Sequence, residues 1–171
     1  MNSILIVPDP KLRQKTNKIP KVTNNEIKIS KKMMDLVQIA PGVGLAANQI
    51  GILKKIVTVN IKENETDDSK IYALFNPIIT DYSKEIIKLE EGCLSLPKQF
   101  AEIERPESII VKYLNDKNKI IEEKKTGIEA RILQHEIDHL SGKLFVDYLS
   151  SLKKNILIKK VLKLKKIGDI K

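Results

Sequence analysis

The order of helix-like and strand-like segments predicts an α+β fold, in which mostly antiparallel β-sheets pack around a central helix that bears an HExxH sequence. One helix-like segment comes first, four strand-like runs follow, and two further helix-like segments complete the pattern. An N-terminal helix and a C-terminal amphipathic helix therefore flank the strands. At 171 residues the chain is expected to form one domain, residues 1–171, which includes a basic last helix at about residues 150–167.

The first helix is predicted from a capping box, in which Thr23 is followed three residues later by Glu26. The Pro41-Gly42 pair marks its end. Between these signals lies an apolar stripe at helical spacing, which consists of Ile29, Met33, Leu36 or Val37, and Ala40.

The second and third helices carry similar signals. Thr126 and Glu129 repeat the capping-box pattern, and Gly142 is a natural C-terminal cap. The helix between these signals runs through Ile132, His135 and His139. The third helix, before Gly168, presents an apolar stripe of Leu157, Val161 and Leu164.

Four runs rich in β-branched residues, which partly alternate with polar ones, predict strands. They cover residues 55–61, 71–80, 108–114 and 119–124. Residues 115–118, Asn-Asp-Lys-Asn, supply a turn between the last two strands. The polar run at residues 62–70 is expected to be a loop between strands rather than a boundary between domains.

Composition limits the compartment and the classes of partner. Aromatic residues make up only 4% and Trp is absent, so the core is expected to consist mainly of Ile, Leu and Val. The apolar start at residues 4–7 is short, lacks a basic leader and stops at Pro8. We therefore expect a cytoplasmic protein without a signal peptide and without a membrane or DNA partner. The net charge of +9 indicates either a solvated Lys-rich surface or attraction to a polyanion such as RNA.

Both histidines of the chain lie in one HExxH sequence, residues 135–139. On a helix, positions i and i+4 share a face, so His135 and His139 can reach one metal ion, with Glu136 on a neighbouring edge. A catalytic site needs a third protein ligand beside the water. The extended HExxHxxGxxH pattern is excluded because Phe145 stands where the third His belongs. The third ligand must therefore be Cys, Asp or Glu.

Cys93 is the candidate for that ligand. The only cysteine of the chain cannot form an internal disulfide, which fits a reducing compartment. A thiolate binds zinc or iron strongly, and metal binding ionises the thiol. Gly92 would let the backbone bend closely, and Pro97 would stiffen the exit. The alternative is a buried, inert cysteine. An HExxH sequence that lacks a third ligand favours the metal.

Residues 42–51 form a segment rich in small residues. Such residues let a substrate backbone approach closely, and Gln49 offers an uncharged amide donor. No Lys-Ser or Lys-Thr follows the glycines, so a nucleotide-binding P-loop is not expected.

Three segments together resemble the ordered motifs of the peptide deformylase family, GxGLAAxQ, EGCLS and HExDH. They lie at residues 42–49, 91–95 and 135–139. The similarity continues at residues 8–13, 76–77, 105–106 and 142–147, so it extends over residues 4 to 150. The turn at residues 115–118 often carries Gly in the family, but Asn tolerates the same left-handed geometry.

The resemblance implies a metal-dependent enzyme that hydrolyses the N-formyl group from the N-terminal formylmethionine of new polypeptides and releases formate. Glu136 would take a proton from the attacking water and later give one to the departing amine. A salt bridge between Glu91 and Arg105 would support the cysteine loop, unless these are two unrelated surface charges. The metal ligands would be Cys93, His135 and His139.

The resemblance also implies how the substrate is held. The side chain of Gln49 and the backbone N–H of Leu94 would complete an oxyanion hole. The backbone of Gly44, together with Val43, would align the peptide.

One divalent metal ion is implied as the cofactor, often Fe²⁺ in this family, with Zn²⁺ or Ni²⁺ as possible substitutes. In bacterial members a comparable basic helix is associated with docking on the ribosome near the exit tunnel. The expected partners are therefore nascent formyl-Met polypeptides and the ribosome. The alternative is a helix packed on the body with a solvated Lys face. Its cations are Lys153, Lys154, Lys159, Lys160, Lys163, Lys165, Lys166 and Lys171.

Two other interpretations stay open at this point. Another HExxH enzyme, such as a small metal-dependent endopeptidase, would cleave internal peptide bonds of unformylated peptide substrates. A basic, non-catalytic RNA- or ribosome-binding protein would need no metal, but it would leave Glu136 and the three motifs unexplained.

Overall fold

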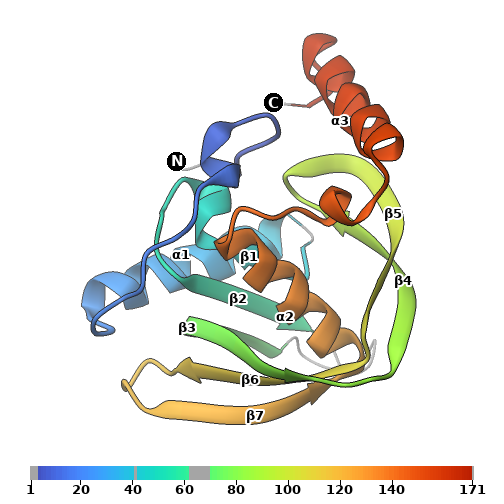
Figure 1. Cartoon of the computed structure of the whole chain (residues 1–171). Coiled ribbons are helices and arrows are strands. Elements are labelled where there is room, and N and C mark those ends of the chain that lie inside the picture. The colour runs from blue at the N-terminus through green and yellow to red at the C-terminus, as the bar shows by residue number, and fades with distance from the viewer. Residues whose placement is uncertain (1–3, 41, 62–69, 171) are drawn as a thin grey trace.

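The computed structural model describes residues 4–40, 42–61 and 70–170, which are drawn in colour in Figure 1. The helices are α1 (Asn24–Ile39), α2 (Gly127–Leu140) and α3 (Ser151–Lys166). Short 3-10 helices lie at Pro10–Arg13, Ala47–Ile50 and Phe145–Tyr148. The strands are β1 (Gly44–Ala46), β2 (Ile56–Ile61), β3 (Lys70–Tyr82), β4 (Ile86–Cys93), β5 (Leu96–Pro106), β6 (Ser108–Leu114) and β7 (Ile120–Thr126).

Antiparallel sheets around a central helix confirm the predicted α+β class. Five strands pair in the order β1-β2-β3-β6-β7, which leaves β1 at an edge. β4 and β5 form a separate two-stranded hairpin, paired from Ile86 opposite Pro106 to Cys93 opposite Leu96. In Figure 1 the larger sheet curves beneath α2, and the β4–β5 hairpin stands at its right-hand side.

The start of α1 is confirmed. The backbone N–H of Thr23 donates to Glu26 Oε2 at 3.0 Å, and the Thr23 hydroxyl accepts from the N–H of Asn25. The Glu26 carboxylate also pairs with Lys54. The helix ends at Ile39, with Ala40 as its C-cap; residue 41, the first of the predicted Pro-Gly stop, lies outside the described residues. Its apolar stripe is buried at Met33 and Val37, as the spacing predicts.

The capping box expected for α2 is wrong, although the position of the cap is right. Thr126 is the N-cap residue, but its side chain forms no capping hydrogen bond. The Glu129 carboxylate accepts instead from the Tyr72 hydroxyl and from Lys125 Nζ, so it is not free to reach back to the cap. At the other end Gly142 has a φ of +76°, and a Cβ there would lie 2.3 Å from the carbonyl oxygen of Arg13. Only glycine fits that position.

The four predicted strands correspond to β2, β3, β6 and β7, and residues 115–118 form the turn between the last two. Asn118 adopts a φ of +59° there, and its side chain hydrogen-bonds the backbone of Val22. Three strands have no counterpart among those predictions: β1, β4 and β5. Most of the expected loop at residues 62–70 lies outside the described residues; Lys70 begins β3.

Aliphatic side chains form most of the core, as the composition predicts. One cluster joins α2 to the larger sheet through Ala46, Val57, Val59, Leu133 and their neighbours. α3 is also anchored, because Val161 is fully buried in a cluster with Leu96 and Phe145. None of the described helices is long and apolar enough to cross a membrane.

Candidate metal centre

Cys93, His135 and His139 converge at one point. Their ligand atoms all lie within 4.8 Å of one another. His139 Nε2 is 3.3 Å from both Cys93 Sγ and His135 Nε2. One thiol and two imidazoles, the donors that zinc and ferrous iron accept, are therefore placed to share one ion. The described part of the chain holds no other cluster of three potential ligands.

Two separate elements supply these groups. α2 places both imidazoles on one face, because they are four residues apart. Cys93 ends β4, where the hairpin pairing shifts register between Gly92 and Cys93. The cysteine thus comes from the smaller sheet and the histidines from the helix, so the centre depends on how the hairpin is held against α2.

The predicted salt bridge of Glu91 and Arg105 is confirmed, and it belongs to a larger buried network. Arg105 Nε lies 2.6 Å from Glu91 Oε1 and Arg105 Nη2 lies 3.1 Å from Oε2. Arg131 Nη1 donates to Oε1 at 2.9 Å, and His135 Nδ1 lies 2.9 Å from Oε2. Burial opposes ionisation of Glu91, but the bonds from His135 and Arg105 outweigh it and hold the pKa well below its usual range.

This network fixes the tautomer of His135. When Nδ1–H donates to the Glu91 carboxylate, Nε2 presents its lone pair to the centre. Burial lowers the pKa of His135, but hydrogen bonds with Cys93 and Glu91 outweigh burial and raise it well above its usual value. His139 is fully buried, and burial together with the positive charge on His135 lowers its pKa, so it stays neutral. A metal ion that binds to Nε2 of His135 must therefore displace a proton from this imidazole.

Glu136 is a buried carboxyl without a partner for one oxygen. The residue is 4% exposed, and its Oε2 has no hydrogen-bond partner among the described residues. Burial raises its pKa to about 7. The Oε1 atom faces β1, since a Cβ on Gly44 would lie 2.6 Å from it. An unpaired acid in this position is available to exchange protons with a bound molecule.

Gln49 is oriented by its own neighbours. The Oε1 atom accepts from the backbone N–H of Ala46 at 2.7 Å. The amide nitrogen therefore points toward the hairpin, 3.2 Å from Ser95 Oγ and 3.6 Å from Cys93 Sγ. The donor predicted from the sequence thus faces the centre.

A cavity of about 450 Å³ opens beside this cluster, and Cys93 and His135 line it. β1 forms one wall, the β4–β5 hairpin another and α2 the floor. The five predicted site residues outside the cluster of potential ligands all line it: Val43, Gly44, Gln49, Leu94 and Glu136. Val43 and Ile128 are more than half exposed at the cavity. The structure therefore brings all eight predicted site residues together.

Arg131 is a charged residue at the site that the sequence predictions missed, as they also missed the apolar lining residues Ile128 and Ile132. It lines the cavity and is 5% exposed. A signal was present, because residue 131 lies four before His135 and eight before His139, on the same helical face. A cation on the face that carries two histidines indicates a buried acid opposite it.

The fold and the site define a metal-dependent hydrolase, with an HExxH helix, a cysteine thiol and a buried acid beside a cavity. Residues 1–155 match the family model described as polypeptide deformylase. The chain is 43% identical over 166 residues to the peptide deformylase of Rickettsia canadensis, with 95% of each chain covered. It is 44% identical over 167 residues to that of Pelagibacter ubique, covering 96% of this chain and 95% of the relative.

Solved structures agree. The peptide deformylase of Ehrlichia chaffeensis in complex with actinonin superposes with a TM-score of 0.89 and 41% identity, covering 94% of this chain and 95% of the other. The chain belongs to the polypeptide deformylase family. It is an enzyme that removes the formyl group from nascent peptides, which decides against the endopeptidase and the non-catalytic RNA binder.

Gly44→Ala is expected to reduce activity sharply. The new Cβ would lie 2.6 Å from Glu136 Oε1 and 2.9 Å from Ile132 Cγ2, so the carboxyl must move. A misplacement of about 1 Å in a catalytic group should lower kcat/KM by about 100-fold, which is measured as formate release. The control is Gly127→Ala, at a φ of +56° with nothing within 4 Å. It should cost about 1 kcal/mol of stability and leave activity intact. Equal activity in both variants would contradict the close approach of Glu136 to β1.

Proposed function

We propose that Cys93, His135 and His139 bind one divalent metal ion and that Glu136 moves protons during deformylation. The observation that carries this proposal is the unpaired, buried Glu136 carboxyl beside the cluster of three ligand atoms. When bound, the metal lowers the pKa of water and polarises the formyl carbonyl. Glu136 takes a proton from the attacking water and later gives one to the departing amine.

Gln49 and Leu94 are proposed to stabilise the developing oxyanion. The Gln49 amide nitrogen faces Cys93, and the backbone N–H of Leu94 follows that ligand directly in the chain. Two such donors near the formyl oxygen are worth about 3–4 kcal/mol each in comparable sites.

The edge strand β1 is proposed to align the peptide. One side of β1 pairs with β2, from Gly44 opposite Val59 to Ala46 opposite Val57. The other side lies at the cavity, where Gly44 would offer its backbone to an extended substrate and Val43, whose carbonyl accepts from the N–H of Asn60, would flank it. The adjoining side chains Ile128 and Ile132 are apolar and suit methionine.

Iron is the metal that we propose in the cell, with zinc or nickel as substitutes. A thiolate and two neutral imidazoles suit all three ions, so the ligands alone do not select among them. A cysteine ligand beside oxidisable iron would make activity sensitive to oxygen and peroxide.

The roles of Glu136 and Cys93 are separable by substitution. Glu136→Ala should keep the metal and lose about 100- to 10,000-fold in the rate of formate release from formyl-Met-Ala-Ser, because only the proton exchange is removed. Cys93→Ser should lose metal, because a hydroxyl is a poorer ligand than a thiolate. Protein loaded without air with Fe²⁺ or Ni²⁺ serves for both measurements. Retained activity in Glu136→Ala, or unchanged metal content in Cys93→Ser, would contradict the assigned role.

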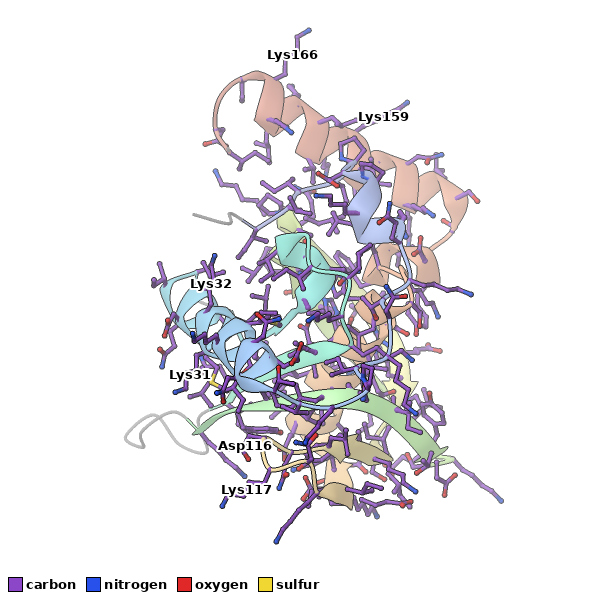
Figure 2. All side chains as sticks on the ribbon, turned by 90° about the vertical axis from the view of Figure 1, so that its left-hand side faces the viewer. Lys31, Lys32, Asp116, Lys117, Lys159 and Lys166 are labelled. Carbon is purple, nitrogen blue, oxygen red and sulfur yellow. The ribbon has the colours of Figure 1, made fainter. Side chains whose placement is uncertain are left out.

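The chain is proposed to act as a single catalytic domain at the ribosome, in the cytoplasm, where nascent chains emerge. The burial of Val161 supports counting α3 as part of this domain. Its other face is strongly basic: Figure 2 shows Lys159 and Lys166 reaching outward from α3, far from Lys31 and Lys32 of α1. A row of exposed cations suits the phosphates of ribosomal RNA.

Neutralising exposed lysines tests this docking without disturbing Val161. Changing Lys159, Lys160, Lys163 and Lys166 to Gln should weaken ribosome cosedimentation. The slope of log affinity against log salt should fall by about 0.7–0.9 for each lost phosphate contact. The matched control changes four other exposed lysines, Lys28, Lys31, Lys32 and Lys117. Equal loss in both quadruple variants would reduce the effect to net charge, and no loss in either would remove the docking proposal.

A further inference from the structure

We infer that Arg131 is a positioning residue of the metal centre, which locks helix α2 to the β4–β5 hairpin and keeps Glu91 in line with His135. The inference rests on the proposed metal triad of Cys93, His135 and His139. Arg131 would touch neither the metal nor the reacting atoms; it acts through the elements that carry the ligands.

The guanidinium of Arg131 joins three points of the hairpin. Nη1 donates to Glu91 Oε1 and to the backbone carbonyl of Ile103, both at 2.9 Å. Nη2 donates to the backbone carbonyl of Ile87 at 2.5 Å. Ile87 belongs to β4 and Ile103 to β5, so one side chain of α2 holds both strands of the hairpin.

The centre needs such a connection because the hairpin is not part of the larger sheet. β4 and β5 pair only with each other in the described strands. The position of Cys93 relative to the histidines therefore depends on contacts of the hairpin with its surroundings: hydrogen bonds with α2, and the apolar packing of Leu96 and Ile103. Apart from the contact of Cys93 with His139, the other described hydrogen bonds between the hairpin and α2 are those of Gln134 with the Pro106 carbonyl, Asp138 with Arg105, and His135 with Glu91.

Charge balance gives Arg131 a second role. Arg105 is shared between two carboxylates, since its Nη1 lies 2.7 Å from Asp138 Oδ2 while Nε and Nη2 hold Glu91. With Arg131 present, two guanidiniums serve two carboxylates. Without it, one guanidinium serves both carboxylates, and Glu91 Oε1 loses one of its two charged donors, which weakens the hold on the carboxylate that faces His135. The three acceptors lie around a planar fork of donors, which a lysine ammonium reproduces only in part.

Arg131→Met is expected to weaken metal binding by about 10- to 100-fold, the usual effect of removing a group that orients a ligand. The probe is Co²⁺, titrated without air against the metal-free protein. The thiolate-to-Co²⁺ absorption band reports the Cys93–metal bond directly and should lose intensity per bound cobalt. Arg131→Lys should lie between the wild type and Arg131→Met in both readouts.

Lys125→Met is the matched control. Lys125 is another buried cation, with a 9% exposed side chain against 6% for Arg131, and it bridges the carboxylates of Glu123 and Glu129. Its ion pairs among the described residues are with Glu123 and Glu129, which belong to neither the hairpin nor the proposed ligands, so its loss should leave Co²⁺ affinity and the absorption band as in the wild type.

The outcomes separate this inference from the proposed function. Wild-type protein that binds no Co²⁺ would overturn the metal triad itself. Wild-type affinity and absorption in folded Arg131→Met would overturn only the role of Arg131. Should Arg131→Met fail to fold, Arg131→Lys decides, because unchanged Co²⁺ affinity and absorption there would remove the requirement for the guanidinium. Equal losses in Lys125→Met would reduce the effect to general stability and also overturn the inference.

Discussion

The buried carboxylate of Glu91 joins the two elements that together supply the proposed metal ligands. It lies two residues before Cys93 on the hairpin, and it forms a hydrogen bond with the imidazole of His135 on α2. An isolated buried carboxylate would be costly, and the guanidiniums of Arg105 and Arg131 remove that cost by supplying charged donors. Because the hairpin pairs with no strand of the larger sheet, this polar junction, together with the apolar cluster that contains Leu96, Ile103 and Phe145, sets the geometry of the centre.

The apolar face of α2 performs the complementary task. Ala130 and Leu133 pack on Val57 and Val59 of the larger sheet, so the helix is held from below while its opposite face carries the polar groups. The same sheet ends in the edge strand β1, whose glycine lets the Glu136 carboxyl approach the cavity wall. The helix therefore has an apolar face that packs on the sheet and a polar face at the cavity. The period of 3.6 residues per turn determines on which face each residue of α2 lies.

Sequence reasoning predicted that Cys93, His135 and His139 would come together, because the signals that select them are local. The spacing of His135 and His139 fixes a shared helical face, and the missing third ligand directs attention to Cys93. The pairing of Glu91 with Arg105 was predicted through the family resemblance. The hairpin strands were missed because their outward faces are charged, at Lys88 and Glu102 among others, which hides the alternation that identifies strands. The capping box at Thr126 failed for a tertiary reason, since Tyr72 and Lys125 claim the Glu129 carboxylate.

X-ray absorption at the metal edge of the zinc-loaded protein tests the central claim most directly. The account predicts one sulfur ligand at about 2.3 Å and two imidazole nitrogens at about 2.0–2.1 Å, completed by a lighter donor from solvent. That shell requires the hairpin and α2 to meet as the Glu91 network places them. A shell of nitrogen and oxygen alone, with no sulfur, would contradict the account, because Cys93 would then lie outside the centre.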